Sequence, residues 1–191
     1  MFKTSILSSL VLLSLMFSAC SKEKNSQQAS SIDDANTVLS TNEFILTALD
    51  KTEYVIDKKP NGFALKNTQG KVIILDIFAT WCPPCRAEAS HLTSLQKKYK
   101  DELVVFGITI EDGIENSKLE AFRKEYNANY ILVNSNENSR LIEAVANKLD
   151  VGKNFGIPLM ALYKDGELIR YYQGAVEEEF LESDIKKALG K

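Results

Sequence analysis

The sequence contains very few of the residues that bind metals or cross-link small folds. Among its 191 residues there are three cysteines, Cys20, Cys82 and Cys85, and one histidine, His91. A structural zinc site needs four ligands, and a c-type haem needs a histidine directly after the second cysteine, where this chain has Arg86. We therefore expect no metal and no cofactor, and we interpret His91 as a solvent-facing helix residue.

Basic clusters and long apolar runs are also missing. Lysine and arginine are dispersed and the formal net charge is −3, which argues against nucleic acid as a partner. The apolar segment Ile6–Phe17 is too short to span a bilayer comfortably, and it follows the basic residue Lys3. This arrangement is typical of a secretion signal and predicts a signal peptide at residues 1–19.

The end of the predicted signal resembles a lipoprotein processing site. Small residues precede Cys20, but the third residue before it is Phe17. An ordinary signal peptidase prefers a small residue there, and lipoprotein sites more often have leucine. The favoured interpretation is that Cys20 is acylated and that the polar residues 20–42 form a flexible tether. An uncleaved anchor and ordinary secretion are the alternatives.

Residues 43–191 have the pattern of one α/β domain. Apolar runs bounded by turn residues predict strands, and apolar residues at helical spacing predict helices. The predicted order is a β-hairpin, then βαβαβα, then a second hairpin and a final helix, which implies parallel central strands with antiparallel strands added to the same sheet. Asn61-Gly62 is interpreted as a turn. The predicted strands are Phe44–Leu49, Tyr54–Ile56, Val72–Phe78, Leu103–Ile110, Tyr130–Val133, Pro158–Tyr163 and Leu168–Tyr172.

The run CPPC at residues 82–85 is the strongest functional signal. It follows a buried strand and begins a predicted helix, and Pro84 suits the first helical position, where no N–H partner is needed. Cys82 would then lie at the helix N-terminus, where free N–H groups and the helix dipole stabilise a thiolate. We expect Cys85 to be less exposed. Cys82 is therefore predicted to attack a disulfide, and Cys85 to resolve the resulting mixed disulfide.

Two acidic residues are expected near this pair. Asp76 lies inside an apolar strand, where burial of an unpaired carboxylate should raise its pKa. Glu88 comes three residues after Cys85 and therefore shares its helix face. The structural alternatives are a locally hydrogen-bonded Asp76 and an ordinary surface Glu88.

The runs DIFATWCPPC and GIPLMALYKDGEL resemble the thioredoxin superfamily. The helix and strand inserted between them are similar to those of the exported TlpA/ResA/CcmG branch, in which a lipobox and a tether are also usual. The resemblance covers about residues 43–190. It implies a thioredoxin fold, in which helices flank a central mixed sheet, with an N-terminal β-hairpin and a TlpA-type helix–strand insertion.

The resemblance implies roles for five residues by position. Pro158 matches a cis-proline that packs against the disulfide, and the backbone of Ile157 would pair with a substrate strand. Trp81 belongs to the implied substrate-binding surface. Asp76 matches a buried acid that exchanges protons with the second cysteine, and Glu88 matches an acid implicated in the redox step.

The sequence departs from the family pattern at two positions. The lysine that partners the buried acid in thioredoxins corresponds to Gly107 here. A proline that usually follows the acid of the TlpA/ResA/CcmG branch corresponds to Ser90, which weakens any inference about a local helix kink.

The implied function is reduction of protein disulfides outside the cytoplasm. The resemblance points to substrates such as apocytochrome c thiols, to a membrane electron donor of the DsbD/CcdA type, and to a lipid-anchored position on the periplasmic side of a bacterial membrane. Pro83 and Pro84 remove N–H donors beside Cys82, which also favours a reductant. The alternatives are a thiol peroxidase, for which threonine is expected where the chain has Ala79, and a tethered chaperone or binding module.

The mature protein should begin at an acylated Cys20 and should partition with membranes. Mass spectrometry of the native N-terminus tests this, and Cys20→Ser should release the protein into the soluble fraction. A free amine at any residue after Cys20, on a wholly soluble protein, would contradict the expectation.

Overall fold

The computed structural model describes residues 42–191, so the predicted signal peptide, Cys20 and the tether up to residue 41 lie outside the described residues. The described chain forms eight strands and four helices. In chain order these are β1 (Glu43–Thr47), β2 (Glu53–Lys59), β3 (Gly62–Leu65), β4 (Val72–Phe78), α1 (Pro83–Lys98), β5 (Leu103–Thr109), α2 (Asn116–Tyr126), β6 (Ile131–Val133), α3 (Asn138–Leu149), β7 (Leu159–Lys164), β8 (Glu167–Gln173) and α4 (Glu178–Leu189).

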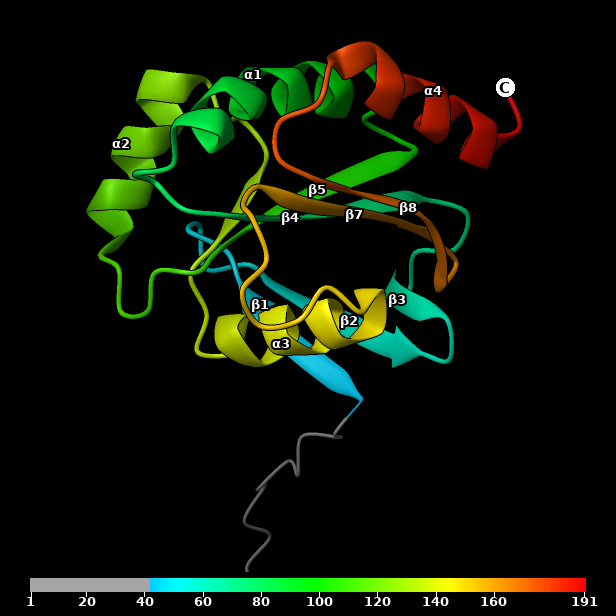
Figure 1. Ribbon diagram of the computed structural model, residues 1–191, viewed down its shortest axis with the longest axis horizontal. Helices are drawn as coiled ribbons and strands as arrows, with labels where there is room; N and C mark the ends of the chain where they lie inside the picture. Colours follow the sequence, from blue (N-terminus) through cyan, green and yellow to red (C-terminus); the bar gives the residue numbers. More distant parts are fainter. Residues whose placement is uncertain (1–41) are drawn as a thin grey trace, which may run out of the picture. The chain divides into compact units, whose positions relative to one another are not determined.

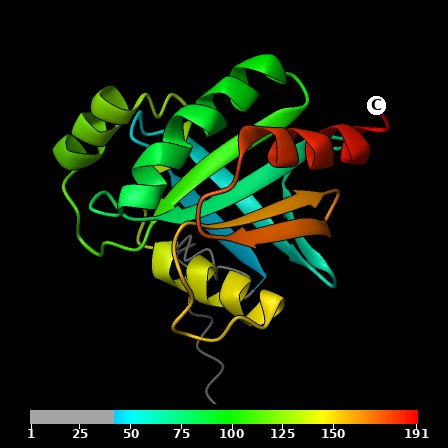
Figure 2. The ribbon, with the colours of Figure 1, turned by 45° about the horizontal axis from the view of Figure 1, so that its top comes forward.

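A five-stranded mixed sheet, with strand order β6-β5-β4-β7-β8, forms the centre of the described chain. Strand β4 pairs in parallel with β5, and β5 with β6, whereas β7 runs antiparallel to both β4 and β8. Figures 1 and 2 show α1, α2 and α4 on one face of this sheet, and α3 with the N-terminal strands on the other. The predicted mixed α/β fold of thioredoxin type is confirmed.

Strand β4 is buried along its whole length because it lies between β5 and β7 and both of its faces are covered. Its side chains alternate between two apolar clusters. Ile74 and Phe78 belong to the cluster that contains residues of α1 together with Cys82 and Cys85. Ile73 and Leu75 belong to the cluster that contains residues of α3. Asp76 therefore points to the α1 side, the same side as the cysteines.

The N-terminal strands form a three-stranded antiparallel sheet, so the predicted two-stranded hairpin is incomplete. Gly62, interpreted from the sequence as part of a turn, is the first residue of β3. A Cβ at this position would lie 2.5 Å from the ring of Tyr163, so the close approach of β3 to β7 requires glycine. Phe63 then packs edge-on against Tyr163, with ring centroids 5.4 Å apart. A strand of four residues is too short for its alternation to be recognised in the sequence.

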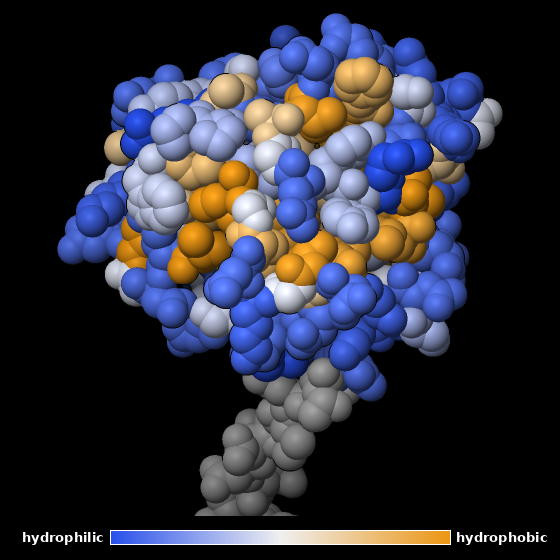
Figure 3. All heavy atoms as spheres, in the orientation of Figure 1, coloured by the Kyte–Doolittle hydropathy of each residue, from blue (hydrophilic) through white to orange (hydrophobic). Residues whose placement is uncertain are grey.

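The surface carries local apolar patches among polar side chains. Figure 3 shows several such patches on the face seen in Figure 1. The large apolar residues that are exposed in the described chain are Trp81, Ile110, Tyr171 and Phe180. None of the helices between residues 42 and 191 combines the length and the apolar character needed to cross a membrane.

Candidate active site

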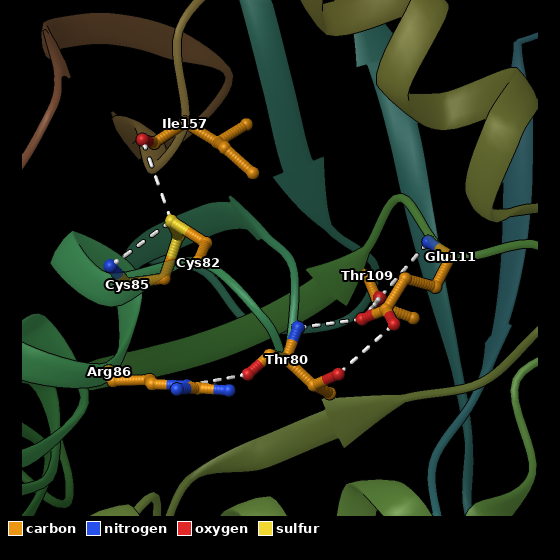
Figure 4. Close-up of a disulfide and its surroundings, with 7 residues drawn as sticks. All are labelled: Thr80, Cys82, Cys85, Arg86, Thr109, Glu111 and Ile157. Carbon is orange, nitrogen blue, oxygen red and sulfur yellow. Dashed lines mark hydrogen bonds between the residues drawn. A yellow bond between two sulfur atoms is a disulfide. The ribbon is translucent and has the colours of Figure 1, made fainter.

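The cysteine pair lies where β4 leads into α1. Cys82 is the N-cap of α1, which begins at Pro83, one residue earlier than the sequence indicated. The two cysteines form a disulfide (Figure 4). Pro83 and Pro84 carry no N–H, so the first free amide of the helix is that of Cys85, which donates to Cys82 Sγ over 3.3 Å. The predicted position of Cys82 at the helix N-terminus is confirmed.

Both cysteines are buried, Cys82 at 2% and Cys85 at 3% exposure. The expectation that Cys85 is the less exposed residue is therefore wrong for the disulfide state. The cause is the loop before β7, whose Ile157 carbonyl oxygen lies 3.7 Å from Cys82 Sγ and covers it (Figure 4). The prediction that Cys82 is the attacking thiol therefore rests on its position at the helix N-terminus, which stabilises a thiolate, and not on its exposure.

The residues expected to contact substrate surround the disulfide. The Ile157–Pro158 peptide bond is cis, as the resemblance implied. The carbonyl of Pro158 accepts a hydrogen bond from the N–H of Gly174 over 2.8 Å, which ties this loop to the end of β8. Trp81, next to Cys82 in the chain, is 59% exposed. Trp81 therefore adjoins Cys82 along the chain, and the Ile157 carbonyl adjoins it in space.

Asp76 is 2% exposed and faces the α1 side of the sheet. Loss of solvation raises the pKa of Asp76 to about 8; the nearby Glu88 adds to the rise, and a hydrogen bond with Tyr130 opposes it. The Oδ1 oxygen of Asp76 is buried without a hydrogen-bond partner. The expected rise in pKa is confirmed, and at neutral pH this carboxyl group is mostly protonated.

Glu88 faces the core from α1, on the buried row that also contains Cys85. It is 1% exposed, so the alternative of an ordinary surface residue is excluded. Its Oε2 accepts a hydrogen bond from the backbone N–H of Val176 over 2.9 Å. Burial raises the pKa of Glu88, and the Val176 hydrogen bond and His91 counteract part of that rise.

His91 faces solvent only in part, because its side chain is 36% exposed. Its Nδ1 is buried and lies 4.0 Å from Glu88 Oε1, and neither of these two atoms has a hydrogen-bond partner. The two residues are three positions apart on α1, so the spacing that placed Glu88 beside Cys85 also places His91 beside Glu88. In residues 42–191, no group of three or more His, Cys, Asp or Glu residues is arranged to hold a metal ion.

Sequence reasoning missed a polar network that supports the turn before Cys82. The carboxylate of Glu111 accepts the backbone N–H of Thr80 over 2.6 Å and the Thr80 hydroxyl over 3.0 Å. Arg86 Nε donates to the Thr80 carbonyl over 2.8 Å, and its guanidinium lies 5.1 Å from the centre of the Tyr126 ring. Figure 4 shows the contacts of Thr80 with Glu111 and Arg86 near the disulfide. The Glu111 contacts depend on the pairing of β4 with β5, which no local spacing in the sequence indicates.

Tyr130 is a second residue that sequence reasoning missed. The sequence indicates only the start of a strand here, but Tyr130 is buried, and its hydroxyl opposes the rise in the pKa of Asp76 as a hydrogen-bond donor. A tyrosine at the start of an apolar run is indistinguishable, from the sequence alone, from an ordinary core aromatic residue.

The chain is similar to proteins that exchange thiols and disulfides. It is 28% identical over 137 residues to the thiol-disulfide oxidoreductase ResA of Bacillus thuringiensis, an alignment that covers 70% of this chain and 72% of ResA. It is 32% identical over 120 residues to the thiol:disulfide interchange protein DsbE of Escherichia coli K12, which covers 62% of this chain and 58% of DsbE. A further match, at 34% identity, is to the thioredoxin-like protein YneN of Bacillus subtilis; it covers 35% of this chain and only 40% of YneN.

Solved structures support the fold. A thiol:disulfide interchange protein of Chlorobium tepidum superposes with a TM-score of 0.62 at 23% identity, over 78% of this chain and 94% of that one. A secreted disulfide oxidoreductase of Mycobacterium tuberculosis, homologous to DsbE, superposes with a TM-score of 0.55 at 19% identity, over 77% of this chain and 97% of that one.

The cysteine pair at the start of α1, together with the similarity to ResA and DsbE, defines a thioredoxin-like thiol:disulfide oxidoreductase. Residues 26–189 match the Redoxin family, and the chain belongs to that family.

Asp76 should make the protein less stable as the pH rises. Between about pH 4, where a carboxyl in the unfolded chain ionises, and about pH 8, folded Asp76 keeps a proton that the unfolded chain has released. The free energy of unfolding should fall across this window by up to about 1.4 kcal/mol per pH unit. Urea unfolding of the oxidised protein at a series of pH values measures this slope.

Asp76→Asn should flatten this slope and should be more stable than the wild type at the alkaline end. Asp184→Asn is the matched control, because Asp184 is also buried but is paired with Arg170. It should retain the falling slope. Equal slopes in the wild type and Asp76→Asn would rule out the buried, protonated carboxyl.

Proposed function

We propose that this protein reduces disulfides in other proteins, with Cys82 as the attacking residue and Cys85 as the resolving residue. The observation that carries the proposal is the position of the pair at the N-terminus of α1, above the buried carboxyl groups of Asp76 and Glu88. A structural disulfide needs neither a helix N-terminus nor buried acids beside it, whereas thiol–disulfide exchange needs a stabilised thiolate and a group that accepts a proton.

The reaction starts from the reduced pair. The Cys82 thiolate attacks one sulfur of the substrate disulfide, and the other substrate sulfur leaves as a thiolate and takes a proton from water. Cys85 then loses its proton and attacks Cys82, which forms the Cys82–Cys85 disulfide and releases the second substrate thiol. The protein pair is oxidised by two electrons, and the substrate disulfide is reduced by the same two.

The surroundings of Cys82 favour reducing character. A dithiol is a strong oxidant when its thiolate is strongly stabilised. Pro83 and Pro84 remove two helix-end donors, and the Cys85 amide is the remaining close one. Arg86 is engaged with the turn at Thr80. The buried acids add no stabilisation either, because a protonated carboxyl group supplies no positive charge and an ionised one disfavours a second negative charge nearby.

For location and partners, the proposal follows the sequence. An acylated Cys20 and the tether at residues 20–42 would hold the domain on the periplasmic side of a bacterial membrane, with apocytochrome c thiols as the substrate and a membrane donor of the DsbD/CcdA type as the source of electrons. The lipobox-like residues before Cys20 and the similarity to ResA and DsbE support this part of the proposal.

A thiol peroxidase is the less favoured function. It would need a hydroxyl aimed at the reactive cysteine. The residue three before Cys82 is Ala79, and the Thr80 hydroxyl is bound to Glu111. A binding module or chaperone is also less favoured. Such a function would give the two cysteines no role, although they lie at a helix N-terminus beside a buried acid.

Variants of the two cysteines should distinguish these functions. Cys85→Ser should trap protein substrates as mixed disulfides on Cys82, and Cys82→Ser should trap none, because only Cys82 attacks. The wild type should reduce insulin in the presence of dithiothreitol and should consume no peroxide. If both variants reduce insulin as fast as the wild type, the cysteines are incidental; peroxide consumption that requires Cys82 would favour the peroxidase.

The reduction potential should lie nearer that of thioredoxin, about −270 mV, than that of DsbA, about −120 mV. Glu88→Gln should raise the potential, with about 30 mV for each tenfold change in the redox equilibrium, and Asp76→Asn should do so mainly above about pH 8, where Asp76 ionises. Glu179→Gln, at an exposed acid of α4, is the control and should leave the potential unchanged. Redox titration against glutathione measures each value, and a wild-type potential near that of DsbA would refute the assignment as a reductant.

A further inference from the structure

Tyr130 brings a hydroxyl group into an otherwise apolar part of the core. It lies just before β6, is 6% exposed, and belongs to the cluster that contains Cys82 and Cys85. Its hydroxyl acts on the carboxyl group of Asp76 as a hydrogen-bond donor that lowers the pKa of Asp76. Burial and the neighbouring acids hold the pKa of Tyr130 well above its usual value. The hydroxyl therefore stays protonated and can donate a hydrogen bond to a carboxylate.

The residue beside Asp76 on β5 makes this contact possible. Gly107 is the partner of Asp76 in the parallel pairing of β4 with β5. A Cβ at Gly107 would lie 2.8 Å from Tyr130 Cε2 and 2.8 Å from Leu132 Cδ2, too close for either to stay in place. The ring of Tyr130 therefore fills the space that a longer side chain at position 107 would occupy. The donor next to the buried acid comes from Tyr130, a neutral group, and not from a charged side chain on β5.

The charged group that acts directly on Asp76 is another acid. Glu88 of α1 acts on Asp76 electrostatically and raises its pKa, and Cys85 lies one helical turn before Glu88 on the same buried row. Glu177 and Glu178 at the start of α4 act in turn on Glu88, and His91 opposes them. On the β7 side, Asp76 is paired with Met160, which carries no charge. Among the described groups that act on Asp76, Tyr130 alone favours its ionised form.

We propose that Tyr130 is a positioning residue: its hydroxyl holds the Asp76 carboxylate in the α1-facing orientation and stabilises it, so that Asp76 can accept the proton of Cys85. This inference rests on the proposed function. In the step concerned, the proton of the Cys85 thiol passes to Asp76, and the Cys85 sulfur forms a bond to Cys82. The bond from Cys82 to the substrate sulfur breaks, and that sulfur leaves with the electron pair.

The test compares two tyrosines that are both buried. Tyr130→Phe removes only the hydroxyl that binds Asp76. Tyr163→Phe is the matched control, because Tyr163 lies in the other core cluster and its hydroxyl has no hydrogen-bond partner. A carbon-13 NMR titration of the Asp76 carboxyl in the oxidised protein measures its pKa directly, without any need for activity.

We expect Asp76 to titrate at about 8 in the wild type and in Tyr163→Phe. In Tyr130→Phe it should titrate about one unit higher, because the carboxylate loses a charge-assisted hydrogen bond. The rate of Cys85 attack on a preformed mixed disulfide should shift along the pH axis by the same amount. In the Asp76→Asn background, Tyr130→Phe should cause no further shift of the rate profile.

The outcomes separate the two proposals. An unchanged Asp76 titration in Tyr130→Phe would overturn the role of Tyr130, as would a shift in the rate profile that persists in the Asp76→Asn background. If the wild type fails to reduce any protein disulfide but the NMR shift is seen, the proposed function fails while the link between Tyr130 and Asp76 stands.

Discussion

The burial of one carboxyl group within the central strand is the constraint around which the site is organised. β4 is covered on both faces, and Asp76 is its only ionisable residue. An ionised carboxylate in such surroundings loses most of its solvation, which is worth several kcal/mol unless it is paired or protonated. Here the carboxyl has no cationic partner and keeps its proton to about pH 8. Asp76 destabilises the fold at neutral pH and lies beside the redox-active cysteines. A destabilising ionisable residue in such a position is typical of a functional site.

Residues on the surrounding elements determine how strongly Asp76 holds its proton. Burial, and then Glu88 from α1, disfavour the ionised form of Asp76, and Tyr130 favours it, so that the pKa lies in the range where a proton can move in either direction. The alternation of β4 turns Asp76 towards α1, and the two prolines at the start of α1 leave the Cys85 amide as the close donor to Cys82. Electron transfer at the cysteines and proton transfer at the acids are thereby placed on the same side of the sheet.

Sequence reasoning recovered the features that local patterns encode. Alternation, apolar runs and the CPPC motif were sufficient for most of the order of strands and helices, for the helix N-terminus at Cys82, for the burial of Asp76 and for the helix face that Glu88 shares with Cys85. Features that depend on contacts between distant segments could not be found in this way. Strand β3 is short and exists because Gly62 can approach Tyr163, the contact of Tyr130 with Asp76 needs Gly107 across the sheet, and Cys82 is covered by Ile157 from a loop far along the chain. Each of these features depends on tertiary contacts, which the local spacing of residues in the sequence does not indicate.

The protonation state of Asp76 beside the redox pair is the central claim, and infrared spectroscopy can observe it directly. A difference spectrum between the reduced and the oxidised protein, recorded near neutral pH, should contain the carbonyl stretch of a protonated carboxylic acid that shifts when the disulfide is reduced. The band should disappear in Asp76→Asn and should lose intensity as the pH is raised through about 8. A wild-type spectrum in which Asp76 contributes only carboxylate bands at neutral pH, in both redox states, would contradict the account.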